Sequence, residues 1–254
     1  MLKTNAILGS VIGDIIGSSY EWERTKNYNF EIFTQEAKFT DDTVLTMAIA
    51  NAILNNESYS NNLIKFTNSY PNCIYGPGYL DWVNTQKSKP SYGNGSAMRI
   101  SSIGVHFNTL EEVLDEAKKA VEMSHYHPEG IKGAQAIAIA IFMAKNGYSK
   151  QEIKTKISAM FMYNLDFTIE QIRPNYDFYP TCQQSVPEAI VAFLESSDYE
   201  STIRLAISLG GDSDTLACMA GGIAAAFYNE IPTNIVKFAS KRIPKKFKEI
   251  INKF

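Results

Sequence analysis

The sequence is poor in cysteine and has no long hydrophobic run. Its three cysteines, Cys73, Cys182 and Cys218, are widely separated. This excludes a disulfide framework and a cysteine-based zinc site, so a reducing cytoplasm is the expected compartment. The two longest stretches without a polar side chain, 136–144 and 216–228, are well short of the roughly 20 residues that a membrane-spanning helix needs. No membrane association is expected.

An excess of basic residues is also absent. The chain has 24 Lys and Arg against 27 Asp and Glu, for a net charge of -3, which argues against an extended nucleic-acid-binding surface. The three histidines lack the spacing of an HExxH zinc motif. Few stretches alternate polar and apolar residues as strands do. With 254 residues, 45% of them hydrophobic, and no linker-like segment, the sequence predicts a single all-α domain spanning 1–254.

One polar turn stands directly before an apolar helix near the C-terminal end. Gly210-Gly211-Asp212-Ser213-Asp214-Thr215 places two carboxylates and two hydroxyls within four residues, ahead of the apolar stretch 216–228. The glycine pair allows a tight turn, and Asp212 or Ser213 is predicted to cap the helix. Taken alone, this turn is typical of a helix cap.

A second polar turn, Phe39-Thr40-Asp41-Asp42-Thr43, opens a helix predicted over 40–55 with Thr40 at its N-cap. Alone, its acids suit the positive end of a helix dipole. If the two helix starts meet, however, four carboxylates converge, and only cations or protons can offset their charges. Mg²⁺ and Mn²⁺ prefer carboxylate, hydroxyl and water oxygens, so the pair of turns predicts a site for a hard metal ion.

The first helix, predicted over 5–20, carries Gly9, Gly13 and Gly17 on one face. Each glycine costs about 1 kcal/mol of helix propensity relative to alanine, so three together indicate a closely packed neighbouring backbone. A long loop follows to residue 38, and 90–99 is a glycine-rich loop whose backbone N–H groups suit phosphate oxygens. Residues 79–89 and 163–181 show no clear periodicity. Further helices are predicted over 59–70, 109–123, 127–147, 149–162, 188–196 and 199–209.

Six segments together resemble the ordered motifs of the ADP-ribosylglycohydrolase family. The resemblance covers nearly the whole chain, and the motifs occur in order at sensible separations. They are Gly13-Asp14 with Tyr20-Glu21, Thr40-Asp41-Asp42-Thr43, Ser91-Tyr92-Gly93-Asn94-Gly95-Ser96-Ala97-Met98-Arg99, Ser124-His125, Ser185-Val186-Pro187 and Gly210-Gly211-Asp212-Ser213-Asp214-Thr215.

The resemblance implies a compact all-α fold with two Mg²⁺ or Mn²⁺ ions between helix N-termini, at the base of an ADP-ribose cleft. The implied metal ligands are Thr40, Asp41, Asp42, Asp212, Asp214 and Thr215, with Asp214 bridging both ions. The implied catalytic residues are Glu21, Asp41 and Asp214. Glu21 matches a mobile acid that closes over the metals, and Glu23 is its nearby competitor. The implied substrate-binding residues are Gly76, Gly78, Ser91, Tyr92, Gly93, Asn94 and His125.

The function implied by the resemblance is hydrolysis of the glycosidic bond between ADP-ribose and a modified side chain, with arginine favoured slightly over serine. The expected partner is an ADP-ribosylated protein or a small ADP-ribosyl conjugate, and a monomer is expected. Two alternatives use the same residues. One is a two-metal phosphohydrolase acting on a nucleotide diphosphate, and the other is a relative that binds ADP-ribose without catalysis.

Overall fold

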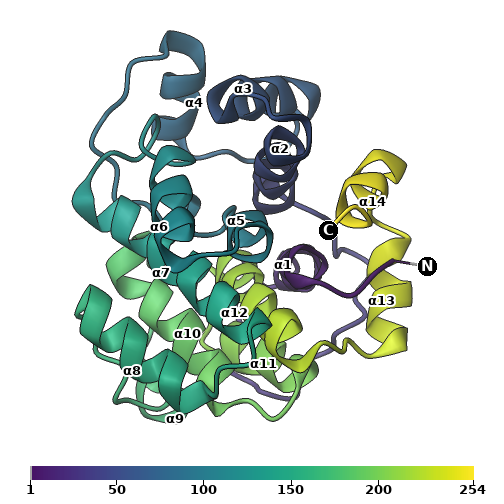
Figure 1. Ribbon diagram of the computed structural model, residues 1–254. Helices are drawn as coiled ribbons and strands as arrows, with labels where there is room; N and C mark the ends of the chain where they lie inside the picture. Colours follow the sequence, from purple (N-terminus) through teal and green to yellow (C-terminus); the bar gives the residue numbers. More distant parts are fainter. Residues whose placement is uncertain (1) are drawn as a thin grey trace.

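The structure, a computed structural model, describes residues 2–254, and its regular elements are helical throughout that range (Figure 1). Gly93 and Thr181 form an isolated bridge, and no strand occurs among the described residues. The all-α prediction is confirmed. The helices are α1 (Ala6–Gly17), α2 (Asp41–Asn55), α3 (Tyr59–Ser69), α4 (Pro77–Thr85), η1 (Asn94–Ser96), α5 (Ser101–His106), α6 (Leu110–Lys119), α7 (Pro128–Lys145), α8 (Lys150–Phe161), α9 (Ile169–Ile172), η2 (Arg173–Asn175), η3 (Cys182–Gln184), α10 (Val186–Glu195), α11 (Tyr199–Ile207), α12 (Ser213–Tyr228), α13 (Thr233–Ser240) and α14 (Lys245–Ile251).

Helices α1 and α12 pack against each other at the centre of the molecule (Figure 1). A Cβ added to Gly9 would lie 2.3 Å from the carbonyl oxygen of Gly221, and one added to Gly13 would lie 2.0 Å from that of Ala217. At Gly17 it would lie 2.5 Å from the Cα of Asp214. The predicted backbone neighbour is therefore α12, and the glycine face fixes the start of α12 against the end of α1.

The two polar turns begin helices, as the sequence predicts, although one capping assignment differs. Thr40 caps α2 by accepting a hydrogen bond from the Asp42 N–H. Before α12, Gly210 turns the chain with a φ of +65°, a conformation that glycine adopts at no steric cost. Asp212 occupies the cap position, but its side chain makes no capping bond; it accepts a hydrogen bond from the Asn94 amide at 2.8 Å instead. The prediction of a capping side chain at Asp212 or Ser213 is wrong, because the Asp212 carboxylate accepts from Asn94 and the Ser213 hydroxyl donates to the carbonyls of Tyr20 and Gly211 instead.

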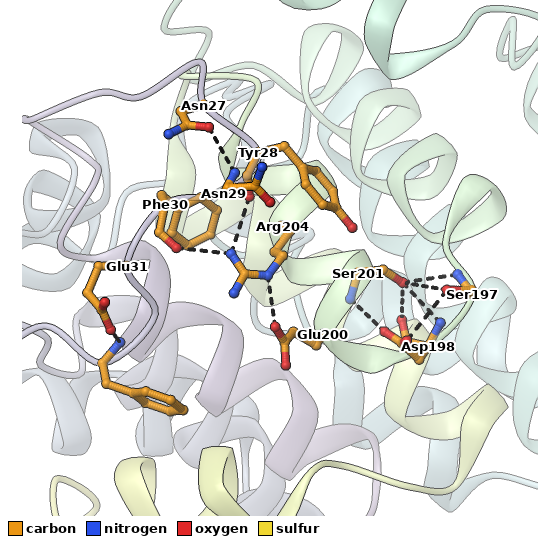
Figure 2. A network of polar contacts seen from close by, with 11 residues as sticks. Asn27, Tyr28, Asn29, Phe30, Glu31, Ser197, Asp198, Glu200, Ser201 and Arg204 are labelled. Atoms are coloured by element: carbon orange, nitrogen blue, oxygen red, sulfur yellow. Dashed lines mark hydrogen bonds and ion pairs between the residues drawn. The ribbon is translucent and has the colours of Figure 1, made fainter.

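Two arginines anchor the loop between α1 and α2. Arg204 of α11 donates hydrogen bonds to the carbonyls of Tyr28 and Phe30, and its Nε donates to Glu200 at 2.8 Å (Figure 2). Arg242 binds carbonyls further along the same loop. These contacts fix the middle of the loop, so its first residues lie beside the starts of α2 and α12.

Two segments without clear periodicity contain short helices. α4 begins two residues before the first segment and ends inside it, and α9 with η2 lies within the second. None of the helices described is both long enough and apolar enough to cross a membrane.

Candidate active site

The starts of α2 and α12 meet as the two-turn hypothesis predicts. Carboxylate oxygens of Glu21, Asp212 and Asp214 all lie within 4.8 Å of one another. Asp41 and Asp42, from the first turn of α2, line the same cavity as these three acids. Five carboxylates from three separate stretches of chain therefore face one small space, which we call the acidic cluster.

Burial and mutual repulsion make the acidic cluster hold protons when no cation is present. The pKa values of Asp42 and Asp214 are raised well above the usual range, first by burial and then by neighbouring carboxylates. Burial, followed by the charges of Asp212 and Asp14, raises the pKa of Glu21 to about 7. These groups strongly favour any positive charge that enters the cluster.

The donor set fits a hard divalent cation. Oδ1 of Asp42 is buried and has no hydrogen-bond partner among the described residues. Such an oxygen costs free energy unless a cation or a proton satisfies it. The five carboxylates and the hydroxyl of Thr215 supply oxygen atoms, the ligands that Mg²⁺ and Mn²⁺ prefer.

Asp14 lies directly beneath the cluster and is completely buried. Its carboxylate accepts hydrogen bonds from the Thr40 N–H at 2.9 Å, the Thr40 hydroxyl at 2.7 Å and the Thr43 N–H at 3.1 Å, and also from the Thr43 hydroxyl. Burial outweighs these bonds and raises its pKa to about 6. Asp14 thus holds the first turn of α2 in place. The sequence marks Asp14 as part of the Gly13-Asp14 motif, and a lone acid within an apolar helix is a signal for such a supporting role.

Both threonines of the predicted ligand set are buried. The hydroxyl proton of Thr40 is committed to Asp14, which leaves its oxygen as an acceptor. Thr215 lines the cavity beside Asp214, and its backbone N–H donates to that carboxylate at 2.9 Å. The first turn of α12 therefore orients Asp214 through its own backbone.

A cavity of about 370 Å³, here called the inner cavity, opens onto the acidic cluster. Most of the predicted substrate-binding residues line it, namely Gly76, Gly78, Ser91, Asn94 and His125. Tyr92 and Gly93 are not among its lining residues. Tyr92 is 48% exposed and packs edge-on against His127, and the backbone of Gly93 pairs with that of Thr181. This pairing turns the middle of the segment away from the cavity while Ser91 and Asn94 face it.

A second cavity of about 530 Å³, here called the outer chamber, shares part of its lining with the inner cavity. The shared residues are Glu21, Trp22, Asp41 and Ile74. Glu23 and Glu36 also line the outer chamber, and the only basic side chain among its lining residues is Lys38. Of the two competing loop acids, Glu21 lies in the acidic cluster, whereas Glu23 is exposed and faces the outer chamber.

Comparisons with known proteins identify the family of this chain. The ADP-ribosylhydrolase ARH3 of Homo sapiens is 24% identical, in a match covering 87% of this chain and 84% of that protein. Its Xenopus tropicalis counterpart is 26% identical, with 90% and 88% covered. A solved structure of an ADP-ribosylglycohydrolase-related protein complex shares the fold, with a TM-score of 0.75, 19% identity and coverage of 98% of this chain and 94% of that one. The family model for ADP-ribosylglycohydrolase matches residues 4–243. The chain therefore belongs to the ADP-ribosylglycohydrolase family and is a hydrolase of glycosidic bonds.

Proposed function

We propose that this enzyme releases ADP-ribose from a modified protein side chain and that its acidic cluster holds two Mg²⁺ or Mn²⁺ ions. The convergence of Glu21, Asp212 and Asp214 within 4.8 Å, at the edge of the inner cavity, is the observation that carries this proposal. The proposed ligands are Thr40, Asp41, Asp42, Asp212, Asp214 and Thr215, with Asp214 shared between the ions. When bound, the metals supply Lewis acidity toward ribose hydroxyls and water.

The inner cavity is proposed to bind ADP-ribose with its distal ribose toward the acidic cluster. A Cβ at Gly76 or Gly78 would meet nothing within 4 Å, so open space for a ligand lies beside the backbone of both residues. Ser91 and Asn94 face the cavity from the glycine-rich loop, and Asn94 also fixes Asp212. The protein thereby fixes the position of the substrate diphosphate relative to the catalytic carboxylates. Such orientation supplies a large part of catalysis.

Glu21 is the proposed acid–base residue. Its pKa of about 7 suits proton transfer near neutral pH, because a catalytic group works best when its pKa lies near the working pH. Cleavage of the bond at C1″ of the distal ribose proceeds through an oxocarbenium-like state in the manner of glycoside hydrolysis. In this state the carboxylates of Asp41 and Asp214 face the developing positive charge.

The outer chamber is proposed to receive the side chain that ADP-ribose leaves. Beyond the proposed metal ligands and Glu21, it offers the carboxylates of Glu23 and Glu36 against the single cation of Lys38. Trp22, which is 69% exposed, lies where the two cavities meet. Carboxylates and an indole suit a planar guanidinium, so we propose an N-glycosidic bond to arginine over an O-glycosidic bond to serine.

A substrate panel tests the bond that is cleaved. Arginine-, serine- and base-linked ADP-ribose are incubated with the protein in Mg²⁺ or in chelator, and products are identified by mass. We expect free ADP-ribose from the arginine conjugate, in Mg²⁺ only. Faster release from the serine conjugate would refute the arginine preference. Products of AMP and ribose phosphate would indicate the phosphohydrolase, and binding without turnover in Mg²⁺ would indicate a catalytically silent relative.

Variants test the residue roles. Asp214→Asn is expected to abolish ADP-ribose release while the fold is retained, because an amide neither bridges two cations nor carries the charge. Near-normal turnover by this variant, measured with metal of defined purity, would refute the assignment. Glu21→Gln should lose most activity, whereas Glu31→Gln, in the same loop but outside the lining of both cavities, serves as the matched control and should retain it.

A further inference from the structure

Arg99 is a buried cation without a counterion. Its side chain is completely inaccessible, and its Nε and Nη1 atoms have no hydrogen-bond partner among the described residues. No carboxylate among residues 2–254 forms an ion pair with it, and the ring of Tyr79 lies 5.7 Å from its Cζ. Arg99 belongs to the lining of the inner cavity. A buried guanidinium is normally paired, so this one leaves an uncompensated positive charge behind the cavity wall, which favours an anion inside the cavity.

The one side-chain hydrogen bond of Arg99 begins a short chain of hydrogen bonds, here called the relay, that leads to the cavity. Its Nη2 donates to the hydroxyl oxygen of Ser124 at 2.7 Å. The same hydroxyl oxygen lies 2.9 Å from Nδ1 of His125. A guanidinium donates and never accepts, so the Ser124 oxygen accepts from Arg99, and its single proton must be donated elsewhere.

Two acceptors compete for the Ser124 proton, and the geometry selects one. The Val121 carbonyl is 3.3 Å from the hydroxyl oxygen. That carbonyl already accepts the backbone N–H groups of Ser124 at 3.0 Å and His125 at 2.8 Å, which occupies both of its lone pairs. Nδ1 of His125 is closer and unoccupied. Ser124 therefore donates to Nδ1, and the proton of a neutral His125 ring resides on Nε2.

The Nε2 edge of the ring faces the glycine-rich loop. A Cβ added to Gly95 would lie 3.4 Å from His125 Nε2, and one added to Gly93 would lie 3.7 Å from it. No hydrogen bond to Nε2 forms within the described part of the chain. Burial, together with the nearby Arg99 charge, holds the His125 pKa well below its usual range, so the ring stays neutral. The Nε2–H group remains available to a ligand.

We propose that Arg99 and Ser124 are positioning residues that fix His125 in the Nε2–H tautomer, so that this group donates to an anionic oxygen of the substrate diphosphate. The ligand named here rests on the proposed function, whereas the tautomer is a property of the protein alone. Ser124 sets the tautomer by donating to Nδ1. Arg99 polarises the Ser124 hydroxyl and adds positive charge behind the anion site.

Nitrogen NMR of the ¹⁵N-histidine-labelled full chain, without substrate, tests the tautomer. The protein has only three histidines, so His106→Gln and His127→Gln complete the assignment. We expect His125 at pH 7 to show a bare Nδ1 and a protonated Nε2. A protonated Nδ1 would overturn the proposal. This result stands whether or not the protein hydrolyses ADP-ribosyl bonds, so its failure is separable from failure of the proposed function.

Ser124→Ala and Ser124→Thr form the matched pair for the relay. The alanine variant should give a mixture of tautomers and bind ADP-ribose about tenfold more weakly, the loss of one hydrogen bond to a charged group. The threonine variant keeps the hydroxyl and should retain both properties, and Arg99→Met should reproduce the mixed tautomer. Binding of adenosine, which lacks phosphates, should be unchanged in all three. Unchanged ADP-ribose affinity in a folded Ser124→Ala protein would refute the role of Ser124 in ligand binding. The NMR spectrum of the wild-type protein determines the tautomer even if a variant fails to fold.

Discussion

Gly17→Ala is expected to damage the active site by displacing backbone, without touching a catalytic side chain. The added Cβ would lie 2.5 Å from the Cα of Asp214 and from the carbonyl oxygen of Ser213. Ordinary contacts begin near 3.4 Å, and backbone cannot rotate aside. The start of α12 must therefore move by about 1 Å. A displacement of that size commonly costs about a hundredfold in rate when it misplaces catalytic groups.

Gly9→Ala is the matched control because it crowds the same pair of helices elsewhere. Its Cβ would lie 2.3 Å from the carbonyl oxygen of Gly221. At 1.5 Å of rise per residue, the position is about 12 Å along α1 from Gly17. Overpacking costs up to about 3 kcal/mol, and the better helix propensity of alanine returns about 1 kcal/mol. Each variant should therefore lose about 2 kcal/mol, or about 4–8 °C in Tm for a chain of this size.

The assays separate stability from site geometry. Tm is measured in chelator, Mg²⁺ affinity by calorimetry and ADP-ribose release by mass, all well below either Tm. We expect both variants to lose stability and only Gly17→Ala to lose Mg²⁺ affinity and about a hundredfold in turnover. Equal turnover by the two variants would show that the start of α12 is not placed by Gly17, and the reasoning would fail.

Three further predictions concern the support of the site. Asp14→Ala leaves the buried N–H groups of Thr40 and Thr43 without an acceptor and should lower the free energy of unfolding by about 3 kcal/mol in chemical denaturation. Asp14→Asn keeps an acceptor and should lower the free energy of unfolding clearly less, and an equal decrease in the two variants would contradict this. In chelator, the free energy of unfolding should fall as pH rises from about 4 to 7, because Asp14 and Glu21 bind protons more tightly in the folded chain, with pKa values of about 6 and about 7. Saturating Mg²⁺ should remove this pH dependence, and a rise in stability over that range in chelator would contradict the prediction. Arg204→Met should speed hydrogen exchange in the loop between α1 and α2 with little change in Tm, and unchanged exchange there would show that the arginine does not anchor the loop.

The helix starts could be predicted because their causes are local, whereas the meeting of the two polar turns is a conditional hypothesis that rests on the family resemblance. Thr40 caps α2 through a hydrogen bond to a residue two positions away. The spacing of Gly9, Gly13 and Gly17 on one face of a helix follows from 3.6 residues per turn. The glycine spacing does not predict which segment packs against this face, since any backbone could fill it. The structure supplies α12, and thereby Asp214.

The remaining features depend on pairings between distant segments. Asp212 looks like a helix cap until the Asn94 amide is seen to hold its carboxylate. Tyr92 looks like a cavity residue until the neighbouring Gly93 pairs with Thr181 and turns the segment. The relay from Arg99 to His125 joins three residues whose contacts no sequence period encodes. Local sequence patterns therefore predicted the helix starts that carry the candidate site, whereas long-range contacts determine which way its side chains face.

The acidic cluster explains why so much packing surrounds it. Asp42 and Asp214 are buried carboxylates whose pKa values are raised by burial and by neighbouring carboxylates, and gathering such like charges opposes folding. Two helix N-termini offset part of this repulsion, since exposed N–H groups and the helix dipole favour negative charge. The close packing of α1 on α12 holds the carboxylates together despite the repulsion that the helix N-termini do not offset. If cations bind as proposed, they offset this repulsion, so the same repulsion that weakens the fold would become affinity for metal.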